Sequence, residues 1–230
     1  MTGRLVLIPT PIDDQSPLEP TAHAMLMKAA LERPEHSVFA IEDLKPGRAR
    51  WLSWGLPREV VDDFVLYNEH TREEIRGELL ERMYMGSDVY LMSDGGLPAF
   101  CDPGRHLVAA CHRDGLSVTS TPFPNSTLLA LALSGFDHNE FLFKGFLPVE
   151  KGERKKALGE IAKRSGTIVL METPYRLTRL LEELNGLWKG QAFMALDLCM
   201  PSQELILGSI SDIARRCKGQ KREFVLILSR

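Results

Sequence analysis

Short apolar segments alternate with amphipathic segments of helical periodicity along the first half of the 230-residue chain. Leu5–Ile8, Ser37–Ile41 and Asp88–Met92 have the length and the apolar content of buried strands. Thr21–Leu31 and Thr71–Tyr84 carry apolar residues at helical spacing, which is typical of helices that cover a sheet. Strands that alternate with helices in this way predict a mostly parallel sheet in an α/β domain.

Two further strands are expected in the first half, at 60–66 and 116–119. The second half of the chain has a different pattern, with strands expected at 141–146, 167–171, 193–198, 204–207 and 224–228. Helices are expected at 105–113, 126–133, 153–164 and 175–184. A proline-rich crossing at Thr119–Pro124 separates the two halves. The fold class is therefore predicted to be α/β, with two α/β domains at residues 1–120 and 121–230.

Composition limits the class of protein. With 44% hydrophobic residues, a chain of this length can bury a sizeable core without metals or disulfides. The net charge of −3 gives no bulk signal for nucleic acid, although a local basic face can bind it. The four cysteines form no C-x-x-C pair and are interpreted as reduced thiols. Since no apolar run approaches the length of a membrane helix, we expect a soluble, cytoplasmic protein with no membrane contact.

Several common catalytic motifs are missing from the sequence. There is no Gly-x-Gly, so the dinucleotide-binding fingerprint is absent, and there is no Walker A loop and no G-x-S-x-G elbow. The six histidines are scattered, and no metal site is expected.

Four segments carry more information, and each also has a plain structural explanation. Ser93–Pro98, followed by Asp102-Pro103-Gly104, comes directly after a predicted strand, where α/β sheets bind ligands. Asn125 or Ser126 can cap a helix whose free N–H groups would bind a polar ligand, although simple capping suffices. The basic run Lys151–Arg164 could face phosphates or could be a solvated helix face. Glu172 could hold a ligand hydroxyl or act as a base, or it could simply be a negative charge that the helix dipole favours at a helix N-terminus.

In this order, the segments resemble the tetrapyrrole-methylase superfamily, and within it the bacterial small-subunit ribosomal RNA cytidine-2′-O-methyltransferases. Ser93-Asp94-Gly95-Gly96-Leu97-Pro98 with Asp102-Pro103-Gly104 is similar to the family's S-D-A-G-x-P…D-P-G loop. Residues 141–158 are similar to its F-L-F-x-G-F-L-P-x-x-K-G-E-R-x-x-A-L block, and residues 172–177 to its E-S-P-H-R-L. The resemblance covers nearly the whole chain, from Leu5 to Leu228.

The resemblance implies S-adenosylmethionine as cofactor in a cleft between two domains, and a homodimer. It implies cofactor-binding roles for a set of strand-end and helix-start positions, namely Pro9, Ser93, Asp94, Gly95, Pro98, Ser126, Thr127, Met171 and Leu196. A hydroxyl acceptor must also lose its proton, and Glu42, Asp43 and Glu172 are candidates for a catalytic base or an orienting group.

The chain departs from the family pattern mainly at positions expected on the substrate side. The family's E-D-T-R is Glu42-Asp43-Leu44-Lys45 here, and its R-E-L-T-K is Leu196-Asp197-Leu198-Cys199-Met200. Three hypotheses follow. The protein methylates a ribose of ribosomal RNA in the small ribosomal subunit, it methylates a tetrapyrrole or another small molecule, or it is a non-catalytic relative that binds a cofactor or a partner.

Overall fold

The computed structural model describes residues 1–13, 15–123 and 125–230, and it divides into two units, Met1–Phe123 and Pro124–Arg230. Each unit is built on its own five-stranded sheet. Among the described residues, no helix is both long enough and apolar enough to cross a membrane.

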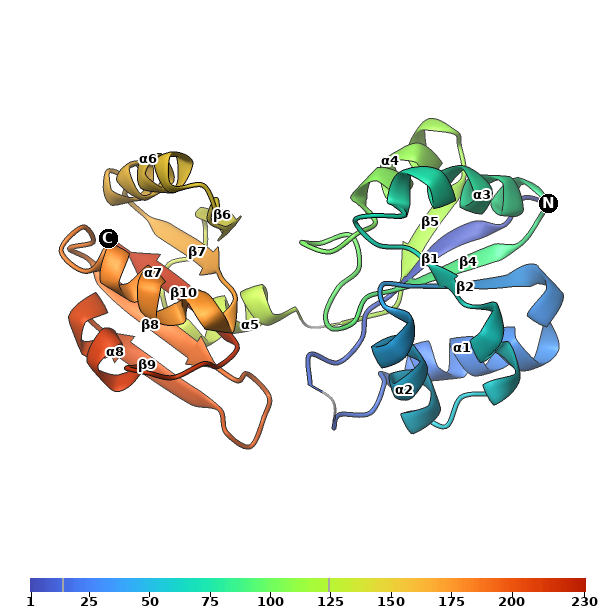
Figure 1. Ribbon diagram of the computed structural model, residues 1–230, viewed down its shortest axis with the longest axis horizontal. Coiled ribbons are helices and arrows are strands. Elements are labelled where there is room, and N and C mark those ends of the chain that lie inside the picture. Colours follow the sequence, from blue (N-terminus) through green and yellow to red (C-terminus); the bar gives the residue numbers. More distant parts are fainter. Residues whose placement is uncertain (14, 124) are drawn as a thin grey trace. The chain divides into compact units, whose positions relative to one another are not determined.

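The first unit is a parallel sheet with strand order β3-β2-β4-β1-β5, as the alternating pattern predicts. Helices cover both of its faces, α1 and α2 on one side and α3 and α4 on the other (Figure 1). The elements are β1 (Arg4–Ile8), α1 (Pro20–Glu32), η1 (Pro34–His36), β2 (Ser37–Ile41), α2 (Leu44–Ser53), η2 (Arg58–Asp63), β3 (Val65–Leu66), α3 (Arg72–Tyr84), β4 (Asp88–Met92), α4 (Arg105–Arg113) and β5 (Ser117–Ser120).

Two details of the first unit differ from the sequence prediction. The strand expected at 60–66 is a 3-10 turn, η2, followed by the two-residue edge strand β3. Val60 and Val61 are both buried, and a turn can direct two consecutive side chains inward whereas a strand alternates them. Helix α2 was not expected, and it packs Trp51 against Phe39 and Phe64 with ring centroids 4.9 and 5.2 Å apart.

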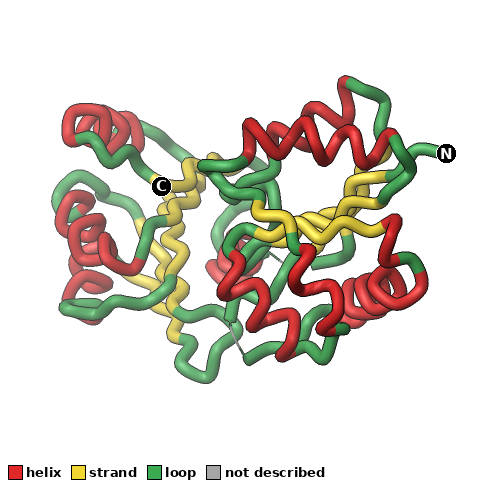
Figure 2. The backbone as a smooth tube through the Cα atoms, turned by 45° about the vertical axis from the view of Figure 1, so that its right-hand side comes forward, coloured by secondary structure: helices red, strands yellow, loops and turns green. Residues whose placement is uncertain are grey.

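The second unit is a mixed sheet with strand order β6-β7-β10-β8-β9. Only β6 and β7 pair in parallel, and the other neighbours are antiparallel. The helices α6, α7 and α8 lie on one face (Figure 2), and α5 packs against β10 and β8. The elements are α5 (Ser126–Ser134), β6 (Phe141–Phe146), α6 (Lys151–Ala162), β7 (Thr167–Met171), η3 (Pro174–Arg176), α7 (Leu177–Leu184), β8 (Gln191–Leu196), β9 (Glu204–Gly208), α8 (Ile210–Arg216) and β10 (Phe224–Ser229).

Candidate active site

Acidic side chains meet at the carboxyl ends of β2 and β4. The two strands are parallel neighbours, with Ile41 opposite Met92, so the chain leaves both strands side by side. The Asp94 N–H donates to Oε2 of Glu42 at 3.2 Å, and the Asp94 carboxylate accepts from the backbone N–H of Asp43. The fold therefore brings Glu42 and Asp43 together with Asp94, far along the sequence, at the carboxyl end of the sheet, where α/β folds generally bind ligands.

A third carboxylate, Asp102, belongs to the same cluster and was not among the predicted site residues. Burial raises the pKa of Asp102 to about 7, and the negative charges of Glu42 and Asp94 add to this effect. A hydrogen bond with the side chain of Ser93 lowers the pKa but does not outweigh them. Burial and the charges of Glu42 and Asp43 raise the pKa of Asp94 to about 6. Asp102 stands in the motif Asp102-Pro103-Gly104, so the signal for it was present in the sequence. The cluster holds more negative charge than its protein surroundings neutralise.

The loop after β4 is tied to the loop after β1. Thr10 and Gly96 exchange two backbone hydrogen bonds of 2.9 and 3.0 Å, and the Thr10 hydroxyl donates to the Ser93 carbonyl at 3.0 Å. Pro9, Thr10, Ser93 and Pro98 have little or no exposed surface. The structure thus brings together the predicted positions Pro9, Ser93, Asp94, Gly95 and Pro98.

This loop also holds an unusual backbone. Ala99 and Cys101 adopt positive φ values of 66° and 68°, although neither is glycine. Such strain persists where surrounding contacts impose it, and it is commonly found at functional sites. At Gly104, with φ at 138°, an added Cβ would lie 2.9 Å from a side-chain carbon of Leu91, so this turn requires glycine.

Arg50 of α2 is a second residue that the sequence did not point to. Its Nη2 donates to the carbonyls of Pro11 and Asp13, the latter at 2.8 Å. Its charge also lowers the pKa of Asp94 in opposition to the stronger effect of burial. Because the unexpected helix α2 carries it, Arg50 supplies a cation to the first loop although the family's arginine in E-D-T-R is absent.

The chemistry of this edge fits S-adenosylmethionine. The cofactor carries two positive centres, a sulfonium and an amine, and the carboxylates of Glu42, Asp94 and Asp102 offer complementary charge. Gly95 is exposed and carries no side chain, so its backbone is accessible to a ligand. No group of three or more His, Cys, Asp and Glu within the described residues is placed to hold a metal ion.

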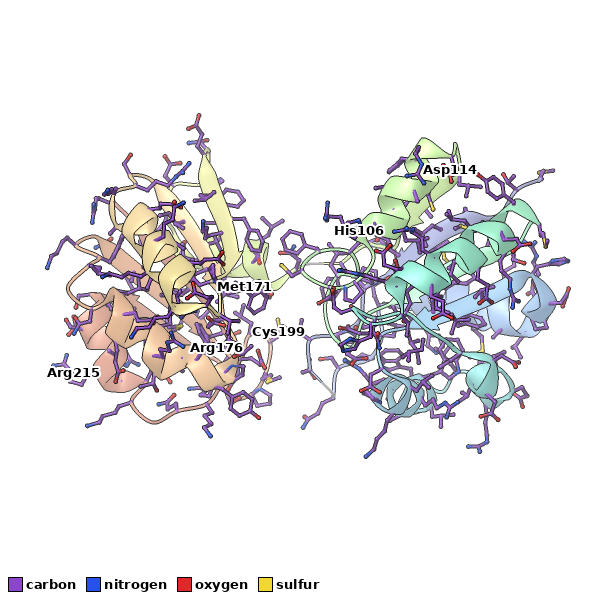
Figure 3. The ribbon with its side chains drawn as sticks, turned by 45° about the horizontal axis from the view of Figure 1, so that its top comes forward. His106, Asp114, Met171, Arg176, Cys199 and Arg215 are labelled. Carbon is purple, nitrogen blue, oxygen red and sulfur yellow. The ribbon has the colours of Figure 1, made fainter. Side chains whose placement is uncertain are left out.

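In the second unit, the predicted positions Met171 and Leu196 lie at the same end of the sheet. Both β7 and β8 run antiparallel to β10, so the two strands reach their carboxyl ends, Met171 and Leu196, on the same side. The Thr127 hydroxyl donates to Sδ of Met171 at 3.6 Å, and Ser126 begins α5 behind an Asn125 cap. The side chain of Leu196 is buried in the core under α7 and α8, so only its backbone is available to a ligand. Figure 3 shows Met171 and Cys199 at this end of the unit.

Glu172 is held in a buried network of charges. One oxygen accepts from Nη1 of Arg154 at 2.8 Å, and the other accepts from Arg176 at 3.2 Å and from the Thr173 N–H at 3.0 Å. Its side chain is 0% exposed, and that of Arg154 is 1% exposed. Arg154 also binds Glu183 at 2.7 Å. These contacts favour a structural role for Glu172, because both oxygens are already engaged inside the protein.

Asp43 also has a local structural role. Its carboxylate accepts from the Lys45 N–H at 3.1 Å and so caps the first turn of α2. Of the three predicted base candidates, Glu42 is the one whose carboxylate faces the Asp94 loop.

Comparison with known proteins identifies the family of this chain. The family model described as Tetrapyrrole (Corrin/Porphyrin) Methylases matches residues 19–214. The chain therefore belongs to the tetrapyrrole methylase family. Ribosomal RNA small subunit methyltransferase I of Mycobacterium tuberculosis is 33% identical over 217 residues, which are 93% of this chain and 72% of that protein. The protein of the same name from Thermotoga maritima is 27% identical over 99% of this chain and 98% of its own length.

A solved structure of another methylase shares the fold. Uroporphyrin-III C-methyltransferase from Thermus thermophilus, complexed with S-adenosylhomocysteine, has a TM-score of 0.58 at 19% identity and covers 99% of this chain and 98% of its own. The chain is an S-adenosylmethionine-dependent methyltransferase of this family, as the motifs implied.

Proposed function

We propose that this tetrapyrrole methylase family member transfers a methyl group to a ribose hydroxyl of small-subunit ribosomal RNA. The observation that carries the proposal is the cluster of Glu42, Asp94 and Asp102 beside the loops after β1 and β4. The cluster combines charge that complements a cationic methyl donor with carboxylates that can accept a hydroxyl proton. Relatives that match nearly the whole chain carry the name of a small-subunit ribosomal RNA methyltransferase.

In this mechanism the protein binds the cofactor, orients the methyl group toward the acceptor hydroxyl and removes the proton of that hydroxyl. S-adenosylmethionine supplies an activated methyl group for in-line displacement, so orientation is the protein's main contribution. A carboxylate with a pKa near neutrality is suited to accept a proton at physiological pH. Asp102, with its pKa raised to about 7, therefore joins Glu42 as a candidate base, and Asp94 holds the cofactor.

The second unit contributes to cofactor binding in this proposal. Met171 offers an apolar thioether, and Ser126 and Thr127 offer backbone groups at the start of the nine-residue helix α5. The backbone at Leu196 completes the set. The proposal extends to a cytoplasmic enzyme, since a ribosomal substrate is found there, and to a homodimer, which sedimentation velocity would detect.

Methylation of a tetrapyrrole or another small molecule is the second candidate. It is favoured by Leu196 and Met200, which stand where the family's R-E-L-T-K has its arginine and its lysine. Asp197, which stands at the glutamate of that motif, accepts from Nε of Arg222 at 2.7 Å, so its charge is already paired within the protein.

The two candidates are separated by one transfer assay. The purified protein and methyl-labelled S-adenosylmethionine are incubated in two separate reactions. One contains small ribosomal subunits that lack the ribose methyl group, and the other contains a set of uroporphyrinoid tetrapyrroles. We expect label in the ribosomal RNA alone. Label in a tetrapyrrole alone would replace the RNA proposal with the second candidate.

Cofactor affinity is expected to depend on pH. Binding of a cationic ligand favours ionised Asp94 and Asp102, so affinity should rise between about pH 5 and pH 8. It should weaken roughly tenfold per unit between pH 7 and pH 6, and up to roughly a hundredfold per unit below pH 6, where both groups must lose a proton. Calorimetric titration in buffers of different ionisation enthalpy would also detect the release of protons on binding. A flat profile across this range would show that the two carboxylates do not face the cofactor.

The stability of the ligand-free protein should change in the opposite direction. Raised folded-state pKa values mean that the folded chain binds more protons than the unfolded chain between about pH 4 and pH 7. The contribution of these two groups to the free energy of unfolding therefore falls as the pH rises through that window. Thermal melts of wild type and the double variant Asp94→Asn/Asp102→Asn isolate the contribution, because the variant should lack it.

RNA binding is expected to depend on exposed lysines of α6. Lys151, Lys155 and Lys156 are exposed, whereas Arg154 of the same run points inward to Glu172. Replacing Lys155 and Lys156 with alanine should weaken RNA binding and reduce the slope of log K against log salt by about 2. The matched control is Lys28→Ala on α1, an exposed lysine of the first unit. Equal slopes for all proteins would exclude α6 from the RNA interface.

A further inference from the structure

A pocket of about 530 Å³ lies in the first unit beside the loop after β1. It is lined by Gln15, Ser16, Pro17, Leu18, Pro20, His23, Ser53 and Trp54. Its volume falls in the range of roughly 300–1,000 Å³ that small-molecule sites occupy. The pocket opens where the first loop enters α1, and α1 starts from the carboxyl side of the sheet.

The walls of the pocket combine an aromatic ring with neutral polar groups. Trp54 ends α2 and is half-buried, and its carbonyl lies 2.9 Å from Nε2 of His23 on α1. Since a carbonyl can only accept, His23 donates through Nε2, and its Nδ1 in the neutral ring remains an acceptor. Among the residues that the structure describes, the lining contains no lysine, arginine or carboxylate. A flat, uncharged, hydrogen-bonding group fits these walls, whereas a phosphate or a polycarboxylate such as a uroporphyrinoid does not.

Arg50 connects the pocket to the candidate active site. Its guanidinium lies over the Trp54 ring at 5.5 Å from the centroid, and it donates to the carbonyls of Pro11 and Asp13 in the first loop. Nη1 of the same guanidinium lies 3.6 Å from the position that a Cβ on Gly95 would take. One side chain thus joins the aromatic wall of the pocket to the Gly95 loop.

We propose that this pocket receives a single unstacked nucleobase of the RNA substrate and stacks it on Trp54. The inference rests on the proposed function, and it adds a base-recognition site to that function. RNA-binding proteins commonly read splayed bases by aromatic stacking and by polar contacts to the base edge. A base held here would position its strand relative to the Gly95 loop through the Arg50 connection.

The test measures binding of a fluorescein-labelled fragment of small-subunit ribosomal RNA by anisotropy, with S-adenosylmethionine affinity measured by calorimetry on the same proteins. Trp54→Ala should weaken RNA binding about 5- to 150-fold, as loss of one stacked base does, and should raise the KM for RNA in proportion. Trp54→Phe keeps a ring and should stay within about 3-fold of wild type. Cofactor affinity should be unchanged in both.

Two further variants exclude a folding defect as the cause. Gln15→Trp fills the pocket from its exposed wall with Trp54 in place, and it should show the same loss of RNA binding. Tyr84→Ala removes an exposed aromatic ring at the end of α3, away from the pocket lining, and should bind RNA as wild type does.

The outcomes separate the pocket from the proposed function. If wild type methylates RNA and Trp54→Ala binds and methylates it equally well, the pocket assignment is overturned and the function stands. If wild type neither binds nor methylates RNA, the proposed function fails and the pocket assignment fails with it.

Discussion

Replacing Asp94 with asparagine is expected to weaken S-adenosylmethionine binding roughly 10- to 150-fold while making the ligand-free protein more stable above about pH 6. The loss in affinity follows from removing a charged hydrogen-bonding partner of the cationic cofactor. The gain in stability follows because burial and the charges of Glu42 and Asp43 disfavour ionised Asp94, and a neutral amide avoids that cost. Opposite effects on binding and stability are typical of functional residues.

The matched control for this experiment lies on the same strand. Asp88 begins β4 and pairs with Arg4 at 3.4 Å, at the amino end of the strand rather than at its carboxyl end. Asp88→Asn should leave cofactor affinity unchanged. Calorimetry and thermal melts of both variants would contradict the assignment if Asp94→Asn bound the cofactor as wild type does, or if both variants lost affinity equally.

Replacing Arg154 with methionine is expected to destabilise the second unit by about 3–5 kcal/mol, because it leaves the buried carboxylate of Glu172 without its main partner. For a unit of about 100 residues, the melting temperature should fall by about 12 °C or more. Arg179→Ala provides a contrast, since the exposed Arg179 reaches Glu183 from the surface and should cost less than about 1 kcal/mol. Differential scanning calorimetry of the variants measures both effects.

A second substitution tests the role of Glu172 itself. Arg154→Met combined with Glu172→Gln removes both buried charges and should recover much of the lost stability. Methyl transfer per folded molecule should persist in the double variant if Glu172 is structural. A complete loss of turnover in a protein that melts normally would restore Glu172 as a catalytic base.

The strands could be predicted from sequence because buried parallel strands are continuous apolar runs. β1, β2 and β4 are of this kind, and their bounds agree closely with the expected ranges. Helix α2 could not be predicted in the same way. It holds Pro46 and Gly47 in its first turns and buries one side chain, Trp51, so it lacks an apolar stripe of helical period.

The candidate site was predictable as separate pieces but not as an assembly. Glu42 and Asp94 were both expected at strand ends, but their contact depends on β2 lying next to β4. The spacing of apolar residues within each segment does not determine the order of strands in a sheet. The basic run that contains Arg154 predicted a solvated or phosphate-facing surface. Only the packing of α6 shows that Arg154 turns inward to a carboxylate 18 positions along the chain.

Locating the label within the RNA tests most directly whether the methyl group goes to a ribose hydroxyl. Small subunits that lack the ribose methyl group are incubated with the protein and methyl-labelled S-adenosylmethionine, and the purified RNA is hydrolysed in alkali. A methylated 2′-hydroxyl cannot assist cleavage of the adjacent phosphodiester, so we expect label in an alkali-resistant dinucleotide. Label recovered in mononucleotides, which would indicate a methylated base, or RNA without label, would contradict it.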